Sequence, residues 1–463
     1  MDTTQKLTWL HLGLGAFHRA HQAVYLNHLI AGGDTSWSLA GGNIRNDAPQ
    51  LMDDLTAQQG EYTLETVTPA GVFSYERITS IKQILPWTPD LAALVATGRQ
   101  PDTRIISFTV TEAGYFLDQN RQLDLSYADL RSDLEQGTML TIYGAISAIL
   151  SARLADGAGP VTLMCCDNIR SNGEHFHTGL VDFLTRRNAL PLLEWVAANT
   201  SCPNAMVDRI TPRPPAAVAG RVLAATGVAD KCAIMAEDFC QWVVEDHFCN
   251  GRPAWEHVGV QMVASVLPYE EAKIRILNAS HSCIAWAGAL QGYTYIHEGT
   301  DDAAIRQMAF DYVTDDVIPC LSPSPVDLAL YRDTVLDRFS NPYIMDTIER
   351  VAADGFAKIP GFIAPTIRER LAHHAPFASV AVLPALFLAF LQARAAGGIA
   401  FTYKDQAMDE GAVQAILAAP HPVHYFCANP LLWGDLASDQ LLEAGITQAY
   451  AAVQQWMKGM QHV

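Results

Sequence analysis

Residues 7–23 have the sequence LTWLHLGLGAFHRAHQA, and this stretch decides the fold of the first half of the chain. The apolar run 7–12 predicts a β-strand, Gly13 and Gly15 predict a tight turn, and a helical pattern extends from about residue 18 to residue 30. A strand, a glycine-containing turn and a helix in this order are typical of the opening of a dinucleotide-binding fold.

The turn itself has two interpretations. In the first, a pyrophosphate lies against its backbone and against the start of the helix, which makes Gly13, Leu14, Gly15, Ala16 and Phe17 the expected cofactor-binding residues. In the second, it is an ordinary connection between a strand and a helix, because the third glycine of the usual GxGxxG pattern is replaced by His18.

Working outward, further short apolar runs alternate with helical patterns up to about residue 267. Strands are expected at 37–40, 104–111 and 161–166, and segments 61–68 and 73–81 alternate like a hairpin around Pro69-Ala70-Gly71. This alternation predicts an α/β fold with a Rossmann-like, doubly wound parallel sheet. We therefore expect a dinucleotide-binding domain over residues 1–267.

From residue 268 the pattern becomes helical, which predicts an α-helical substrate and catalytic domain over 268–463. The expected helices span 270–290, 302–313, 324–338, 383–395, 409–418 and 435–458.

Composition limits the class of protein. The 463 residues are 50% hydrophobic, and 30 Lys+Arg against 49 Asp+Glu give a net charge of −19, which disfavours nucleic acid and anionic membranes as partners. The longest apolar run, 377–391, is short for a membrane span and contains Pro384. Nine cysteines without CxxC spacing, and a polar start without a signal-peptide core, predict reduced thiols in a cytoplasm. We interpret Cys165 and Cys166 as buried apolar residues rather than zinc ligands.

The residues after the second strand leave the form of the nicotinamide cofactor open. Asp47 would bind an adenosine ribose hydroxyl and favour NAD, whereas Arg45 would accept a 2′-phosphate and favour NADP. Asn46 or Asp47 could equally cap a helix.

The segment 268–282, PYEEAKIRILNASHS, carries the most informative polar residues. At about 100° per residue, Lys273, Asn278 and His281 lie at about 0°, 140° and 80°, within one broad face of a helix. A solvated helix edge is the ordinary explanation, but apolar flanking residues indicate a buried helix, and burial shifts a lysine toward its neutral form, as a general base requires. Two further polar pairs stand out: Asp167-Asn168 follows the apolar run VTLMCC, and Asp208-Arg209 lies within VDRITPRPP. Each could form a site, a helix cap or a structural turn.

Together these segments resemble the mannitol dehydrogenase family of polyol-specific long-chain dehydrogenases. The matching motifs extend over nearly the whole chain: GLGAFHRAHQA (13–23), TVTEAGY (109–115), CDNIRSNG (166–173), VDRITPR (207–213), PYEEAKIRILNASHS (268–282), RFSNPY (338–343) and DGFAKIPGF (354–362). The resemblance implies metal-free, NAD-dependent oxidation of a sugar alcohol, with D-arabinitol converted reversibly to D-xylulose as the leading expectation. Mannitol, fructuronate or tagaturonate as substrate, NADP as cofactor, and a non-catalytic nucleotide-sensing protein are the alternatives.

The resemblance also implies roles for individual residues. Lys273 is the expected general base, and Asn168 and Asn278 are expected to hydrogen-bond the developing alkoxide. The other matched residues are His281, Asp208, Arg350 and Lys358 around the polyol, Glu270 as a gate for the proton, and Val110, Thr111 and Glu112 near the nicotinamide. For Glu112, a structural cap is an equally open interpretation. Because members of this family can work alone, a monomer is preferred.

Overall fold

The computed structural model describes residues 6–118, 122–212 and 216–460. These residues form two compact units, the first comprising 1–68 and 72–267 and the second 69–71 and 268–463. Each unit is described by itself.

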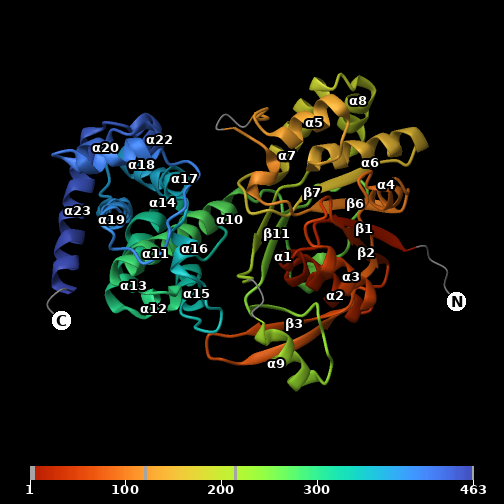
Figure 1. Cartoon of the computed structure of the whole chain (residues 1–463), viewed down its shortest axis with the longest axis horizontal. Helices are drawn as coiled ribbons and strands as arrows, with labels where there is room; N and C mark the ends of the chain where they lie inside the picture. The colour runs from red at the N-terminus through yellow and green to blue at the C-terminus, as the bar shows by residue number, and fades with distance from the viewer. Residues whose placement is uncertain (1–5, 119–121, 213–215, 461–463) are drawn as a thin grey trace. The chain divides into compact units, whose positions relative to one another are not determined.

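A six-stranded sheet organises the first unit (Figure 1). Its strand order is β5-β2-β1-β6-β7-β8, and every neighbouring pair is parallel. The strands are β1 (Leu7–Leu12), β2 (Trp37–Gly42), β5 (Ile81–Ile84), β6 (Thr103–Phe108), β7 (Val161–Cys165) and β8 (Thr200–Ser201). Counting only these strands, the order is 3-2-1-4-5-6, that of a doubly wound dinucleotide-binding sheet. The predicted parallel sheet is confirmed.

Helices cover both faces of this sheet (Figure 1). Each face has its own apolar core. The helices are α1 (Ala16–Ala20), α2 (Gln22–Ala31), α3 (Pro49–Ala57), α4 (Ala92–Gly98), α5 (Ala128–Gln136), α6 (Ile142–Asp156), α7 (Asn172–Arg186) and α8 (Leu190–Asn199). Alternate residues of a strand enter opposite cores: Trp9 and Ile105 enter one, and Leu10 and Ile106 the other. Strands buried on both faces explain the continuous apolar runs of the sequence.

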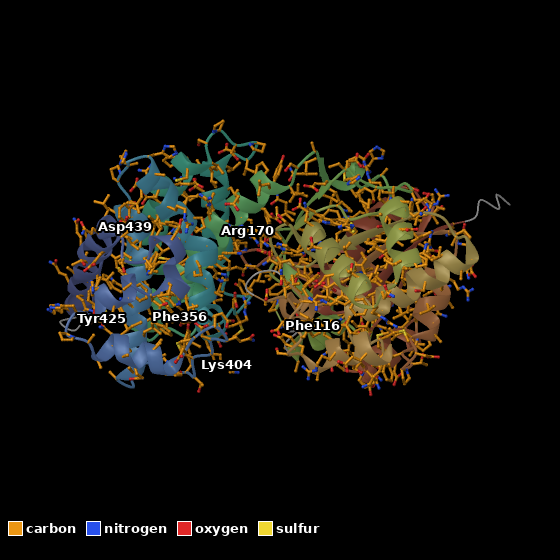
Figure 2. The ribbon with its side chains drawn as sticks, turned by 90° about the horizontal axis from the view of Figure 1, so that it is seen from above. Phe116, Arg170, Phe356, Lys404, Tyr425 and Asp439 are labelled. Atoms are coloured by element: carbon orange, nitrogen blue, oxygen red, sulfur yellow. The ribbon has the colours of Figure 1, made fainter. Side chains whose placement is uncertain are left out.

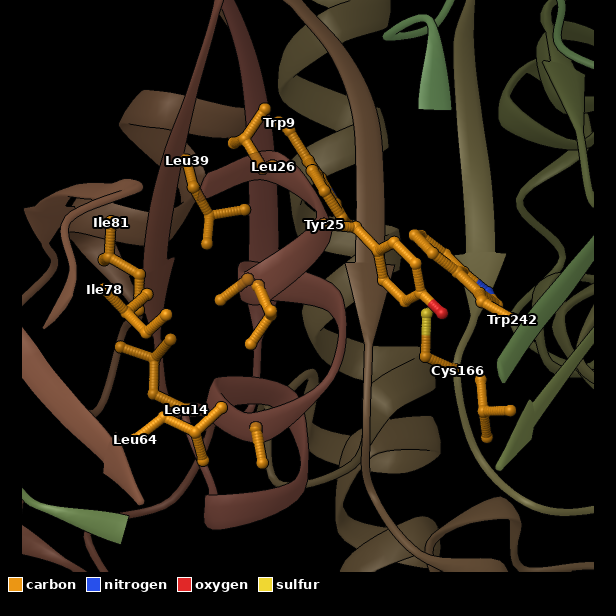
Figure 3. Packing of buried hydrophobic residues seen from close by; sticks show 14 of the residues in the cluster. Trp9, Leu14, Tyr25, Leu26, Leu39, Leu64, Ile78, Ile81, Cys166 and Trp242 are labelled. Carbon is orange, nitrogen blue, oxygen red and sulfur yellow. The ribbon is translucent and has the colours of Figure 1, made fainter. Parts of the chain in front are cut away.

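A hairpin interrupts the βαβ pattern between β2 and β5. Strands β3 (Tyr62–Val67) and β4 (Phe73–Ile78) pair antiparallel, as predicted, and β10 (Ile234–Glu237) joins β3 in parallel. A third sheet, β12-β11-β9, contains β9 (Ala205–Asp208), β11 (Gln241–Glu245) and β12 (Gln261–Val263). Figure 3 shows one end of the adjoining core, where Tyr25 packs against Trp242 of β11 with ring centroids 5.5 Å apart. The first unit also includes α9 (Ala217–Thr226) and two 3₁₀ turns, η1 (Glu112–Tyr115) and η2 (Trp255–Val258).

In the described residues of the second unit, regular structure is helical. Its elements are α10 (Leu267–Ala272), which begins one residue before the unit, η3 (Lys273–Asn278), α11 (Ala279–Gln291), α12 (Ile296–Asp301), α13 (Ala303–Asp311), η4 (Tyr312–Val317), α14 (Ile318–Leu321), α15 (Leu328–Phe339), α16 (Ile348–Ala352), α17 (Gly355–Lys358), η5 (Ile359–Ile363), α18 (Ala364–Ala372), α19 (Ala378–Ala395), α20 (Glu410–Ala418), α21 (Pro422–Cys427), α22 (Pro430–Trp433), η6 (Gly434–Leu436) and α23 (Gln440–Met460). By length and composition α19 could cross a membrane. It contains Pro384, however, and 61% of its 18 residues are buried within the fold. In this fold α19 is a core helix, against which α23 packs.

Two predicted helices differ from the structure in ways that matter for the site. The helix expected over 18–30 is broken at His21, which separates α1 from α2. The helix expected over 270–290 contains a π-helical turn, η3, in which the backbone bonds from i to i+5. Two more π-turns, η4 and η5, pack against η3.

Candidate functional site

The glycine turn after β1 is fixed by backbone geometry. Gly13 has φ +108°, and a Cβ there would lie 2.4 Å from the carbonyl oxygen of Thr109. The N–H of Gly13 donates to the Gly42 carbonyl at 2.8 Å, and the N–H of Leu14 donates to Asn43 Oδ1 at 2.8 Å. The Leu14 side chain is fully buried in the core. Hydrogen bonds to the end of β2 and the close approach of Thr109 therefore hold the turn in place.

At Gly15, unlike Gly13, no contact within the protein excludes a side chain. It has extended backbone with φ −69°, and a Cβ on it would have no atom within 4 Å. A residue that could carry a side chain but carries none leaves room for a ligand to approach the backbone, which is the role of the second glycine in dinucleotide turns. Ala16 and Phe17 follow at the start of α1. Since α1 has only five residues, its dipole contributes less than the helix expected from the sequence.

His18 occupies the position of the missing third glycine, and it forms a stacked pair with His11. The His18 ring stacks on the His11 ring with centroids 3.4 Å apart. His11 also contacts Ser107 Oγ at 2.7 Å through Nδ1 and Thr109 Oγ1 at 3.2 Å through Nε2. Burial lowers the pKa of His11 to about 3, so two neutral imidazoles can pack face to face. Close packing of helix and strand is thus achieved without glycine.

A buried carboxylate joins the loops that follow β6 and β7. Asp167 accepts hydrogen bonds from the N–H groups of Val110 and Thr111, each at 2.9 Å, and from the Tyr115 hydroxyl. Because β6 ends at Phe108, the two N–H groups belong to a loop and not to the expected strand end. Sequence reasoning had noted Asp167 only as part of a polar pair. The Glu112 side chain lies outside the described residues.

Two other predicted polar residues lie at the carboxyl ends of strands in the same unit. Asn168 is exposed and directly follows Asp167 beyond β7. Asp208 is buried at the end of β9. Its neighbour Arg209 donates to the carbonyls of Ala20 and Glu237, so this arginine ties α1 and β10 to the end of β9.

The residues that were expected to choose between NAD and NADP lie at the surface. Arg45 Nη2 pairs with Asp129 Oδ2 at 2.9 Å, and both side chains are about half exposed. Asp47 is exposed. Because Arg45 already has a partner within the protein, a 2′-phosphate would compete with Asp129 for its guanidinium.

In the second unit, Lys273 begins the π-turn η3 and Asn278 ends it. Lys273 is 5% exposed, Asn278 is half-buried, and Glu270 is buried in the preceding α10. The 140° separation expected from α-helical geometry is wrong for this pair. In a π-turn residues five apart are about one turn apart, so Lys273 and Asn278 lie on the same face.

The surroundings of η3 fix it in place. Arg275 pairs with Glu271 at 2.8 Å and with Glu369 of α18 at 2.6 Å. The Tyr312 hydroxyl of η4 donates to the Arg275 carbonyl at 2.7 Å. A π-turn leaves its backbone less regularly bonded than an α-turn, and these contacts hold the irregular segment in one conformation.

His281, Arg350 and Lys358 belong to one charged cluster, which also contains Asp346. His281 Nε2 lies 3.2 Å from Asp346 Oδ2, a distance that allows attraction although the N–H is not well aligned for a hydrogen bond. Arg350 binds the same carboxylate with two donors. Lys358 donates to the Val351 carbonyl, and burial lowers the pKa of Lys358 to about 8. Sequence reasoning missed Asp346, because it lies in no quoted motif.

The structure therefore groups the predicted residues into two sets. The turn, the loops beyond β6 and β7, and Asp208 belong to the first unit, and Glu270, Lys273, Asn278, His281, Arg350 and Lys358 belong to the second. Across the described ranges, no three His, Cys, Asp or Glu side chains gather as a metal site would require.

Comparison with known proteins agrees with this division. Residues 8–257 match the model of the mannitol dehydrogenase Rossmann domain, and residues 265–454 match that of the mannitol dehydrogenase C-terminal domain. The chain is 57% identical to D-arabinitol 4-dehydrogenase of Ralstonia nicotianae, with 96% of each protein covered, and 53% identical to that of Klebsiella pneumoniae, with 97% and 98% covered. Among solved structures it is similar to mannitol 2-dehydrogenase of Pseudomonas fluorescens in ternary complex with NAD and D-mannitol. The TM-score is 0.84 at 34% identity, covering 99% of this chain and 94% of that one.

Proposed function

The chain belongs to the mannitol dehydrogenase family, and from this premise we propose that it is an NAD-dependent polyol dehydrogenase that oxidises D-arabinitol reversibly to D-xylulose. The observation that carries the proposal is the identity of 57% and 53% to two D-arabinitol 4-dehydrogenases over nearly the whole chain. The same family includes a mannitol 2-dehydrogenase of known structure, so D-mannitol is the substrate against which D-arabinitol must be compared.

The residues of the first unit fit a dinucleotide. The open space over Gly15 accommodates a pyrophosphate, and the loop that Asp167 holds places Val110 and Thr111 at the carboxyl ends of the central strands. When bound, NAD accepts the hydride that leaves the alcohol carbon. Asp47 is the proposed partner of the adenosine ribose.

The remaining predicted residues are proposed to act on the proton and the oxygen of the substrate. As the alcohol C–H bond breaks, the hydroxyl proton moves to Nζ of a neutral Lys273, and the carbonyl forms. Asn278 and Asn168 stabilise the charge that develops on the oxygen, since amide donors do this without adding an acidic proton. Glu270, one turn before Lys273, passes the proton to solvent. His281, Arg350, Lys358 and Asp208 bind the other hydroxyls.

The state of the cysteines supports a reducing compartment, and we place the protein in the cytoplasm. All nine are free thiols, and Cys165, Cys166, Cys232, Cys283 and Cys427 are buried. Burial raises the pKa of the Cys232 thiol to about 11 and of the Cys283 thiol to about 12, which keeps them unreactive. A monomer remains the preferred form.

The test is an initial-rate assay by NADH absorbance with D-arabinitol, D-mannitol and fructuronate, each with NAD and with NADP. D-arabinitol with NAD should give the highest kcat/KM. Higher activity with either other substrate would replace the proposed one, and NADH binding without any turnover would support a nucleotide-sensing protein.

Removal of the base tests the chemistry. Lys273→Ala should lower kcat by about 10²–10⁴-fold, the usual contribution of a general base, while the Kd for NADH stays within a factor of two or so. Lys404→Ala, which removes an exposed lysine of the second unit (Figure 2), is the control and should match the wild type. Full activity of Lys273→Ala would contradict the assignment.

A further inference from the structure

Asp346 is the common partner of two side chains that are proposed to bind substrate. Its Oδ2 lies 3.2 Å from His281 Nε2, and its two oxygens accept from Arg350, with Nε–Oδ1 at 2.7 Å and Nη2–Oδ2 at 2.5 Å. The Asp346 side chain is only 9% exposed. A carboxylate buried to this extent needs such partners, so the three groups form one unit.

The backbone around Asp346 is held at several points. Its carbonyl accepts from the Ile296 N–H at 2.9 Å, and the Ile348 N–H donates to the Thr294 carbonyl at 2.9 Å. Thr347, the next residue, caps α16 by accepting from the Arg350 N–H. The carboxylate therefore has a fixed position, and it can orient the groups that it touches.

For His281, the facing carboxylate favours one position of the ring proton by electrostatic attraction. The ring stacks on Phe339 with centroids 4.3 Å apart, and burial lowers the pKa of His281 although Asp346 opposes this shift. The imidazole is therefore neutral, and the proton is favoured on Nε2, which faces the carboxylate. Nδ1 is then a hydrogen-bond acceptor, to which a sugar hydroxyl can donate.

For Arg350, the carboxylate cancels the charge. Nε and Nη2 are the donors with which an arginine binds a substrate carboxylate in bidentate geometry, and both are already used by Asp346. The nearby Lys358 uses one of its three N–H donors on the Val351 carbonyl, and its remaining donors can bind a hydroxyl of a neutral polyol. A sugar acid entering this cluster would meet Asp346 as a competing anion, whereas a neutral polyol would not.

We propose that Asp346 is a positioning and specificity-determining residue, which presents His281 as an acceptor for a substrate hydroxyl and occupies Arg350 so that neutral polyols are preferred to sugar acids. This inference rests on the proposed function. It assigns the preference for an uncharged substrate to a residue that need not touch the substrate.

The experiment compares Asp346→Asn with the wild type in the oxidation of D-arabinitol by NAD and the reduction of fructuronate by NADH. Asparagine keeps the shape and removes the charge. The KM for D-arabinitol should rise about 10-fold with a smaller change in kcat, because one charge-assisted contact is worth about that much. The ratio of kcat/KM for fructuronate to kcat/KM for D-arabinitol should rise at least about 10-fold. Asp346→Glu, which restores the charge, should return this ratio toward the wild-type value.

The matched control is Asp337→Asn in the same unit. Asp337 also pairs with an arginine, Arg306 at 2.9 Å, but it is exposed, so the variant makes the same change of charge away from the cluster. An equal ratio in Asp346→Asn, Asp337→Asn and the wild type, with Asp346→Asn folded by thermal unfolding, would overturn the inference alone. A wild type that oxidises no polyol would overturn the proposed function together with it.

Discussion

The glycine turn of the first unit and the lysine segment of the second are built on opposite principles. The turn depends on backbone geometry. Gly13 adopts a conformation that other residues avoid, and its N–H group donates to the Gly42 carbonyl of β2. The lysine segment depends on side chains, above all those of Lys273 and Asn278. The π-turn that carries them is held by contacts such as the ion pair between Arg275 and Glu369.

The two sites should therefore respond differently to substitution. A backbone site depends on a few positions where any side chain is excluded, so substitution there should weaken cofactor binding. A side-chain site depends on groups that can be changed one at a time, so substitution there should change kcat or KM for the substrate and leave the cofactor bound. Five changes test this separation.

Among these five, the largest effect is expected for Asn278, at the end of η3. Asn278→Ala should lower kcat by about 10²–10³-fold, as the loss of one donor to a developing oxyanion does. The Kd for NADH, measured by fluorescence titration, should not change. Asn46→Ala, at an exposed asparagine of the first unit, is the control. A weaker NADH complex in Asn278→Ala would show that the two regions are not separable.

Gly13→Ala should act in the opposite way. The new Cβ would lie 2.4 Å from the Thr109 carbonyl oxygen at a φ of +108°, so the turn must move. We expect the Kd for NADH to rise at least about 10-fold and the melting temperature to fall, since strain of this kind costs about 1–3 kcal/mol.

Gly15→Ala is the matched control for the same turn. With no protein atom within 4 Å of the added methyl group, its melting temperature should equal that of the wild type. NADH affinity should still fall, because the methyl group would occupy the space of the ligand. Unchanged NADH affinity in Gly15→Ala would contradict the proposal that the pyrophosphate binds at this position.

A pH profile tests Lys358. With its pKa lowered by burial to about 8, the side chain is an ammonium below that pH and a neutral amine above it. If the ammonium donates to a substrate hydroxyl, the KM for D-arabinitol should rise several-fold as the pH increases past about 8, by loss of a charged donor. Lys358→Arg stays charged and should flatten this rise. A wild-type KM that is constant from pH 7 to pH 9.5 or so would contradict the role.

The smallest effect is expected for Arg45. Its ion pair with Asp129 is about half exposed on both sides, and such pairs contribute about 0–1 kcal/mol. Arg45→Ala should therefore shift the free energy of unfolding by less than about 1 kcal/mol. Activity with NAD should change little. A large loss of residual activity with NADP would instead show that Arg45 can leave Asp129 to bind a 2′-phosphate.

The parts of this molecule that follow from local pattern were predictable. Four strands of the parallel sheet, β1, β2, β6 and β7, and the hairpin around Pro69-Ala70-Gly71 are confirmed, because alternation and buried apolar runs are properties of the local sequence. Strand β5 and strands β8 to β12 were not predicted, since they are two to five residues long and their pairing is set by distant segments. The break at His21 depends in the same way on long-range contacts, such as the bond from His21 Nε2 to the Gln241 carbonyl.

The candidate site was predictable to a smaller extent. The glycine turn has a local signature, whereas Lys273, Asn278 and His281 were singled out by buried polar character and assigned roles only by family resemblance. Helical periodicity gave them the wrong relative angles, because nothing in the sequence KIRILN announces a π-turn. Asp346 was not singled out, since its i,i+4 partner Arg350 gives an ordinary helical pattern and its contact with the distant His281 appears only in the fold.

A π-turn holds one residue more than the α-turn that it replaces, so a helix that contains one has in effect absorbed an insertion. In η3 this extra residue is accommodated while α11 keeps its apolar face, with Cys283, Ile284 and Trp286 fully buried. The buried side chains of η3 itself, Ile274, Ile276 and Leu277, join this packing to the segment that carries the reactive groups. Deletion of one codon within η3 would therefore change the position of Lys273 relative to Asn278.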